Sequence, residues 1–290
     1  MDFDFSAFLV LLTAVTGVIW WFDAWFLAPK RRQVFAITQE KEKAQMPDQT
    51  PEPGASSDES LAHTPYQEPI LVEYAKSFFP VILIVLLLRS FLVEPFRIPS
   101  GSMLPTLLVG DFILVNKYAY GVRLPVLNIK IIDVDSPERG DVVVFRYPKD
   151  PSVDYIKRVV GLPGDEIVYR DKVIYVNGVA QSQSPNGIYE DTGTNLAMSG
   201  SQRLVESLGD VKHDILHRDL PSLDGRWEVP QGHYFMMGDN RDNSSDGRRW
   251  GFVPEENLVG SAFFVWMSWN GDSNGILDKI RFSRLGNVIQ

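Results

Sequence analysis

Two serines stand on either side of a glycine in the segment 98–107, which reads Ile-Pro-Ser-Gly-Ser-Met-Leu-Pro-Thr-Leu. Glycine permits a tight turn and the nearby prolines restrict the backbone, so Ser100 and Ser102 can be held at one fixed place beside backbone N–H groups. A fixed hydroxyl with such donors around it suits nucleophilic serine chemistry. The same residue types are common in loops, and a simple linker is the alternative interpretation.

A lysine that could act as a base lies in the segment 154–165, Asp-Tyr-Ile-Lys-Arg-Val-Val-Gly-Leu-Pro-Gly-Asp. Its apolar pattern predicts a strand, in which Lys157 shares a face with Tyr155 and Val159. If that face is buried, loss of solvation lowers the pKa of the amine, and a neutral amine can take a proton from serine. The alternative is that Lys157 or Arg158 is an ordinary strand cation facing solvent.

The segment 238–251 is dense in turn formers and hydrogen-bonding side chains, which suits a polar scaffold around a site. A surface turn is the alternative, although it needs neither so many carboxylates nor the arginine pair that follows them. Calcium binding is a further alternative, because Asp242, Ser244 and Asp246 imitate the opening of an EF-hand loop. The twelfth position is Val253 where a bidentate glutamate is required, so calcium is disfavoured.

Other groups that could activate a serine are sparse in this 290-residue chain. Cysteine is absent, which excludes a thiolate nucleophile and cysteine-based zinc sites. The net charge of −9 gives no electrostatic reason to bind nucleic acid. A serine–histidine pair is not excluded by spacing, but no local signature supports one. The four histidines are scattered, at His63, His213, His217 and His233.

Two apolar segments, at about 5–27 and 74–96, are long enough to cross a bilayer as helices. Six lysines and arginines lie near their ends and between them, whereas the N-terminal flank holds no cation. Because such cations stay on the cytoplasmic side, both termini should lie outside the cytoplasm. A cleaved secretory signal is the alternative for the first segment, but it would require a positive N-terminal region and a shorter apolar run.

The predicted domain organisation follows from these spans. After residue 96, short β-branched and aromatic runs alternate with turn signals and predict a mainly β, antiparallel body. Asn177-Gly178 after Val-Ile-Tyr-Val predicts a two-residue hairpin. Residues 181–223 are polar and weakly patterned, which predicts an inserted subdomain or surface excursion. The parts are a first span at 1–28, a cytoplasmic loop at 29–73, a second span at 74–95 and an extracytoplasmic catalytic domain at 96–290.

The three polar segments, in this order after two spans, closely resemble bacterial type I signal peptidase, the leader peptidase of two-membrane bacteria. The resemblance covers most of the chain and includes the closing Arg-Phe-Ser-Arg at 281–284. It implies a serine protease in which Ser102 is the acylating nucleophile and Lys157 the general base. It also implies that the Ser102 N–H and the Ser100 hydroxyl form the oxyanion hole. The corresponding scaffold residues are Ser244, which would orient the amine, and Asp246, Arg248, Asp239 and Arg241.

The same resemblance implies shallow pockets for small residues, typically alanine, one and three positions before the cut. Neither a metal nor a cofactor is required by the family. The expected partners are preproteins that carry signal peptides and the phospholipid bilayer, and the expected location is the inner membrane with the catalytic domain on its periplasmic side. The residues that match the pockets are Phe96, Ile98, Met103, Leu107, Tyr155 and Ile156.

Two other functions remain open at the level of sequence. A self-cleaving repressor-like protease shares the Ser/Lys dyad and the β fold, but two spans and the lack of a helix-turn-helix argue against it. A membrane-tethered periplasmic binding or scaffold module would keep the same serine, lysine and aspartate residues as structural groups. Cleavage of a precursor with an Ala-X-Ala site distinguishes these functions from a signal peptidase.

Overall fold

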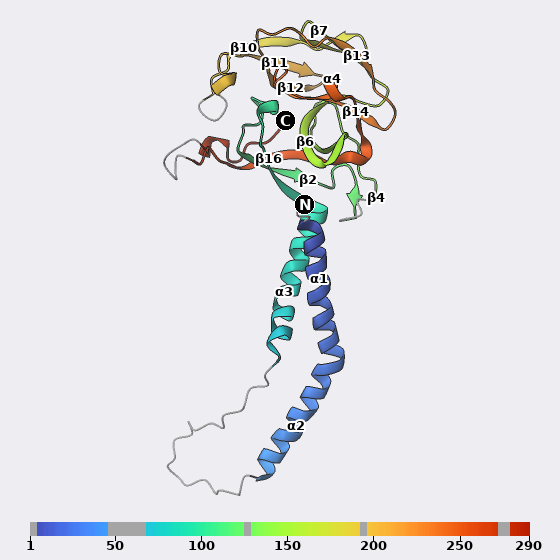
Figure 1. Cartoon of the computed structure of the whole chain (residues 1–290), viewed down its shortest axis with the longest axis vertical. Helices are drawn as coiled ribbons and strands as arrows, with labels where there is room; N and C mark the ends of the chain where they lie inside the picture. Colours follow the sequence, from blue (N-terminus) through green and yellow to red (C-terminus); the bar gives the residue numbers. More distant parts are fainter. Residues whose placement is uncertain (1–4, 46–67, 125–128, 192–195, 272–278) are drawn as a thin grey trace. The chain divides into compact units, whose positions relative to one another are not determined.

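The computed structural model describes residues 5–45, 68–124, 129–191, 196–271 and 279–290 (Figure 1). The chain divides into two compact units, Met1–Leu88 and Arg89–Gln290. The first is helical and the second is mainly β, as the sequence predicts.

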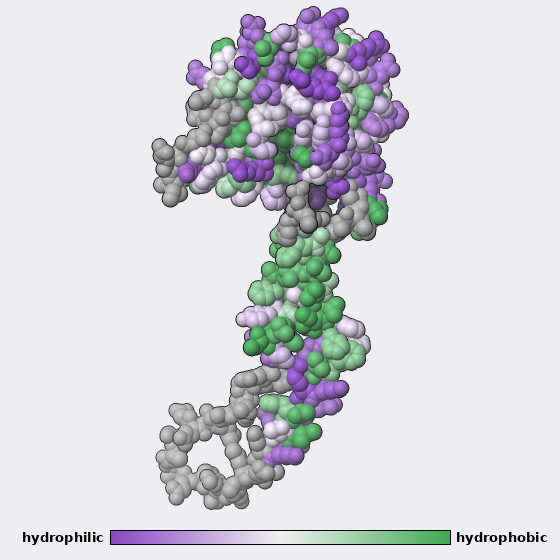
Figure 2. Space-filling view, in the orientation of Figure 1, coloured by the Kyte–Doolittle hydropathy of each residue, from purple (hydrophilic) through white to green (hydrophobic). Residues whose placement is uncertain are grey.

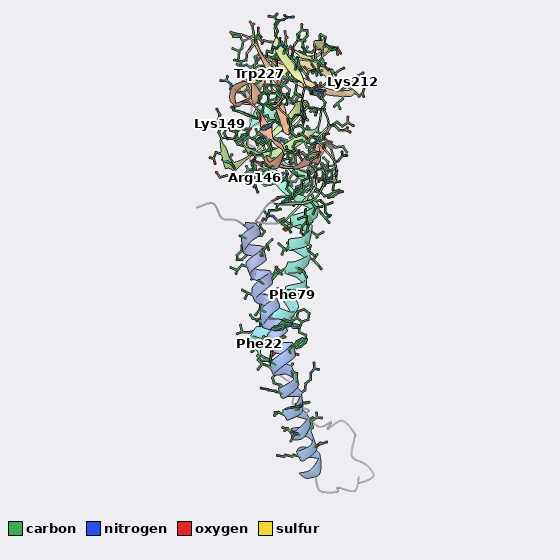
Figure 3. The ribbon with its side chains drawn as sticks, turned by 90° about the vertical axis from the view of Figure 1, so that its right-hand side faces the viewer. Phe22, Phe79, Arg146, Lys149, Lys212 and Trp227 are labelled. Atoms are coloured by element: carbon green, nitrogen blue, oxygen red, sulfur yellow. The ribbon has the colours of Figure 1, made fainter. Side chains whose placement is uncertain are left out.

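The helical unit contains two long apolar helices. The helix α1 (Phe5–Phe22) continues through a π-helical segment (Asp23–Leu27) into α2 (Ala28–Gln45), and α3 (Ile70–Leu87) returns. Within this unit α1 packs on α3, where the Phe79 ring lies so close to Gly17 that an added Cβ would come within 2.8 Å of it (Figure 3). The surface along α1 and α3 is apolar (Figure 2). By length and composition, Phe5–Lys41 and Ile70–Leu92 could each cross a membrane.

The second helix ends earlier than the sequence predicts. After α3, a π-helical turn (Leu88–Leu92) closes the helix, and Val93–Arg97 form the strand β1 instead of extending the span to residue 95. Strand β1 pairs antiparallel with β2 (Asp111–Asn116) at the edge of a sheet. Pro95 explains the difference, because proline disrupts a helix but is tolerated in an edge strand.

The β unit is built on a seven-stranded sheet whose neighbouring strands are antiparallel, in the order β1-β2-β16-β5-β6-β14-β15. Strand β6 lies inside this sheet, between β5 and β14, so it is paired on both edges. Buried side chains on the two faces form separate hydrophobic clusters. The remaining bounds are β5 (Val142–Tyr147), β6 (Asp150–Gly161), β14 (His233–Met237), β15 (Val253–Pro254) and β16 (Leu258–Ser268).

Smaller sheets complete the body. The predicted hairpin is confirmed, with Asn177 and Gly178 at positive φ angles of 50° and 81°, as a type I′ turn requires. It joins β8 to β9 in a four-stranded sheet, and β3 pairs with β4. The bounds are β3 (Val122–Arg123), β4 (Lys130–Ile132), β7 (Glu166–Arg170), β8 (Val173–Val176), β9 (Val179–Ala180) and β13 (Gly225–Glu228).

The predicted excursion at 181–223 contains a three-stranded sheet, formed by β10 (Gln183–Ile188), β11 (Gln202–Leu208) and β12 (Val211–His217) (Figure 1). Leu208, Ile215 and Leu216 of this sheet have no exposed surface. We refer to these three strands as the inserted sheet. It therefore has a buried face, which the polar composition of the segment conceals.

Candidate active site

Ser102 and Lys157 meet at the edge of the β unit's core. Ser102 lies in a short 3-10 turn (Gly101–Met103) after β1, and Lys157 projects from β6. The amine nitrogen of Lys157 lies 2.7 Å from the hydroxyl oxygen of Ser102 and also donates to the Ile156 carbonyl at 2.7 Å. Ser102 is 9% exposed and Lys157 4%. A hydroxyl and an amine are thus in direct contact in an almost water-free place.

Burial controls the charge of this amine. Loss of solvation lowers the pKa of Lys157 to about 8, although the negative charges of Asp246 and Asp239 oppose the shift. The Tyr155 ring, on the same face of β6, lies 5.5 Å from the amine. Because no carboxylate is paired with Lys157, a large fraction of molecules carries a neutral amine near pH 8.

The serine turn is also close to a second hydroxyl. Ser100 Oγ lies 3.5 Å from Ser102 Oγ. Ser100 adopts an extended conformation just before the turn and is exposed. This arrangement leaves Ser100 accessible from solvent while Ser102 is held inside.

The loop that follows β14 forms the scaffold around the serine. Asp246 pairs with Arg248 at 2.8 Å, accepts from the Gly238 N–H and caps the short helix α4 (Gly247–Trp250). At Gly238 an added Cβ would lie 2.3 Å from Ser244 Oγ and 2.4 Å from the Ser102 carbonyl oxygen, so only glycine fits. Ser244 Oγ is buried without a hydrogen-bond partner, and it makes no bond to the Lys157 amine.

Four of the six predicted pocket residues line one small pocket of about 40 Å³. These are Phe96, Ile98, Tyr155 and Ile156. Met103 and Leu107 are fully buried instead and pack into the hydrophobic cluster that includes Ile98. They therefore lie in the core beside the pocket residues and not among its lining.

A fully buried charged cluster lies beside the site and includes Asp239 and Arg241, two of the expected scaffold residues. Arg158 makes a bidentate ion pair with Asp239, which also accepts from Thr106 Oγ1 at 2.5 Å. Arg241 makes a second bidentate pair, with Glu206 of the inserted sheet. Arg158 is therefore not a strand cation facing solvent, since it has no exposed surface. Glu206 was missed by sequence reasoning, because it comes from a polar segment without a pattern.

The alternatives left open by the sequence find little support in the described residues. None of the three described histidines hydrogen-bonds to Ser102 or Lys157, and His213 contacts Glu206 instead, at 3.4 Å; His63 lies outside the described ranges. The carboxylates proposed as calcium ligands face cations, since Asp242 pairs with Lys172 and Asp246 with Arg248. The loop is therefore an ion-paired scaffold.

Comparisons of the sequence with known proteins identify relatives of this chain. A family described as signal peptidase, peptidase S26, matches residues 71–269. Signal peptidase I of Pseudomonas fluorescens is 49% identical over 304 residues, covering 99% of this chain and 100% of the relative. That of Haemophilus influenzae is 37% identical over 338 residues, covering 99% and 92%.

A solved signal peptidase I from Enterococcus faecalis is 27% identical, with a TM-score of 0.30 over 44% of this chain and 98% of that one. The family match covers more than half of the chain, and the sequence relatives match over nearly its whole length. The chain therefore belongs to the signal peptidase family, peptidase S26.

Proposed function

We propose that this chain is a membrane-anchored signal peptidase I that removes N-terminal signal peptides from exported preproteins with a Ser102/Lys157 dyad. The observation that carries the proposal is the 2.7 Å contact between a buried hydroxyl and a buried amine of lowered pKa. A neutral amine at that distance is within reach of the serine proton. Membership of the family supports the same activity.

In the proposed reaction the neutral Lys157 amine accepts the Ser102 proton while the hydroxyl oxygen attacks the scissile carbonyl carbon. The negative charge that develops on the carbonyl oxygen is stabilised by the Ser102 N–H and the Ser100 hydroxyl. The Lys157 ammonium then gives its proton to the leaving amine of the mature protein. Water, deprotonated by the same lysine, then attacks the acyl carbon. The bond from that carbon to Ser102 Oγ breaks, Ser102 Oγ takes the proton back from Lys157, and the signal peptide leaves with a free carboxylate.

The pocket supports a preference for small residues. The pocket is small and its lining is mostly apolar, which suits a short apolar side chain such as that of alanine. Phe96, Ile98, Tyr155 and Ile156 would contact that side chain, whereas Met103 and Leu107 would hold the pocket wall from behind. We therefore propose cleavage after Ala-X-Ala sequences.

The scaffold residues have positioning roles in this proposal. Asp246 and Arg248 fix the loop, because their ion pair is buried and also binds two backbone N–H groups. Ser244 Oγ, which is buried without a partner, is available to orient the Lys157 amine once that amine has taken the proton.

We propose the following membrane organisation. Residues 1–28 and 70–92 span the inner membrane, the connecting residues 29–69 are cytoplasmic, and the β body that follows residue 92 lies on the periplasmic side. The support is the two candidate spans and the cations between them, including Lys30, Arg31 and Lys76. Protease added to intact spheroplasts should digest the β body and leave the connecting loop intact.

The decisive experiment offers a preprotein with an Ala-X-Ala site to the purified full chain in detergent. The expected result is one cut after the second alanine, lost in both Ser102→Ala and Lys157→Ala. A Ser245→Ala variant, altered at an exposed serine of the same loop, should cleave normally. Preprotein that binds but is never cut would favour the tethered binding module. Cleavage by the Ser102→Ala variant would rule out the Ser102/Lys157 mechanism.

A further inference from the structure

The inserted sheet reaches the nucleophile through a continuous series of buried contacts. Glu206 of β11 has no exposed surface, and its two carboxylate oxygens accept from the two terminal nitrogens of Arg241. Burial alone would raise the pKa of Glu206, but the Arg241 guanidinium holds it well below its usual range. The carboxylate is therefore charged, and it fixes Arg241 in a defined place.

The backbone on both sides of Asn240 is held by the same sheet. The Leu216 N–H of β12 donates to the Asp239 carbonyl at 2.9 Å, and the Arg241 N–H donates to the Leu216 carbonyl at 3.1 Å. Leu216 and Asn240 thus form an isolated bridge between the inserted sheet and the loop. Asn240 is fixed by a side-chain ion pair next to it and by hydrogen bonds on either side.

Asn240 makes two hydrogen bonds to the turn that carries Ser102. Its side-chain Nδ2 donates to the Gly101 carbonyl at 2.9 Å, and its backbone N–H donates to the Ser102 carbonyl at 3.1 Å. The Gly101 carbonyl and the Ser102 N–H belong to one planar peptide unit and point in opposite directions. Fixing that carbonyl therefore also fixes the direction of the Ser102 N–H.

We propose that Asn240 is a positioning residue for the oxyanion hole and that the inserted sheet acts through it. The Asn240 amide aims the Ser102 N–H at the developing oxyanion, and Glu206 and Leu216 hold Asn240 in place. This inference rests on the proposed role of Ser102 and adds a function for residues 181–223. Binding of the uncleaved substrate does not require the aimed N–H, whereas the charged tetrahedral state does.

The first test is the variant Asn240→Ala in the full-length enzyme. We expect kcat for an Ala-X-Ala peptide to fall roughly 10- to 100-fold with KM within about twofold, because a misaimed donor affects the transition state alone. The pH at which activity rises should not change, since Lys157 is untouched. A higher KM with an unchanged kcat would overturn the inference.

Inhibition constants give a readout that does not depend on how much enzyme is folded. A peptide aldehyde ending at the cleavage position forms a tetrahedral adduct with Ser102, whereas an uncleavable peptide of the same sequence does not. We expect Asn240→Ala to weaken the aldehyde by the same factor as kcat and to leave the uncleavable peptide unchanged. Equal weakening of both ligands, or of neither, would contradict a role in aiming the N–H.

The inserted sheet is tested by a double-mutant cycle with Glu206→Gln. Because Glu206 is proposed to act through Asn240, the double variant should be no slower than Asn240→Ala within about twofold. If the kcat losses of the two single variants multiply in the double variant, Glu206 does not act through Asn240. The matched control is Asp214→Asn, which removes the Arg203–Asp214 pair from the same sheet, where Arg203 is 40% exposed, and should change kcat less than twofold.

These outcomes are separable from failure of the proposed function. If Ser102→Ala still cleaves the peptide, the dyad is wrong and the aldehyde data carry no meaning for Asn240. If Ser102→Ala is inactive while Asn240→Ala keeps normal kcat and aldehyde affinity, the dyad stands and only the positioning role is lost.

Discussion

Lys157 and Arg158 are adjacent on β6, both are buried, and their surroundings are opposite. Lys157 faces a serine hydroxyl, a carbonyl and an aromatic ring, with no carboxylate paired to it. Arg158 faces a bidentate carboxylate and two main-chain oxygens, from Gly140 and Gln290. One cation is thus kept without a counterion so that it can lose its proton, and the other is paired so that it keeps its charge.

The difference teaches how one strand can serve both catalysis and stability. Successive side chains of a strand point to opposite faces, and β6 is covered on both. On the Lys157 face, burial disfavours charge and produces a base. On the Arg158 face, the carboxylates of Asp239 and Glu206 form ion pairs that stabilise the loop carrying Asn240 and Ser244.

The largest expected effect comes from removing the base. Lys157→Met should lower kcat by about 10⁴-fold or more, as for a member of a catalytic unit, without lowering the melting temperature, because an apolar side chain replaces an unpaired buried amine. Lys157→Arg is the sharper variant, since a guanidinium keeps the charge but does not deprotonate. Cleavage assays and thermal unfolding check both, and more than about one hundredth of normal activity in Lys157→Arg would be inconsistent with a general base.

The neighbouring cation should behave in the opposite way. Arg158→Met leaves Asp239 buried without its partner and should reduce the free energy of unfolding by about 3–5 kcal/mol. Replacing both partners, with Arg158→Met and Asp239→Leu, should recover a good part of that loss. Denaturant unfolding of the full chain in detergent measures the free energy of unfolding of both variants. An unchanged stability in the single variant would mean that the pair contributes nothing.

Stability should depend on pH differently in the two regions. The unfolded Lys157 binds a proton up to about pH 10.5 and the folded one only up to about 8, so stability rises with pH between these values, by about 3 kcal/mol in total. Lys157→Met should abolish this rise. Burial raises the pKa of Asp239, but Arg158 lowers it below its ordinary value, so the contribution of Asp239 is lost only as pH falls through that lowered pKa.

The smallest expected effect concerns the aromatic ring beside the amine. Tyr155→Leu removes a ring that favours the ammonium, so the pKa of Lys157 should fall by about half a unit. The acid side of the kcat profile then moves to lower pH. Tyr155→Phe keeps the ring and is the matched control. A shift of equal size in Tyr155→Phe would assign the effect to the hydroxyl and not to the ring.

The sequence predicted the fold class, the hairpin at Asn177-Gly178 and the three segments that meet at Ser102. These features are encoded locally, in alternation, turn residues and short motifs. The end of the second helix was misplaced because Val93 and Phe96 of β1 extend the apolar run beyond the helix, although Pro95 could have marked the boundary. The strand pattern could place Lys157 on one face, but not reveal that the face of Arg158 is buried as well.

The inserted sheet shows why the rest of the site was not predictable. Glu206 is a buried charge in a polar segment, and its burial is tolerated only because Arg241, 35 residues later, supplies two hydrogen bonds. Asn240 donates hydrogen bonds to two carbonyls, those of Gly101 and Ser102, in a turn that is distant in sequence. Such pairings depend on tertiary contacts, which no local pattern in one sequence contains.

Burial of the Lys157 amine should lower its pKa enough that a large fraction of molecules carries the neutral base near pH 8. Its titration can be followed directly by NMR of isotope-labelled lysines in the detergent-solubilised full chain, with the Lys157 signal assigned by its loss in Lys157→Met. The expected pKa of this amine is about 8, well below the ordinary lysine value of 10.5. A pKa near 10.5, in enzyme that still cleaves its substrate, would contradict it.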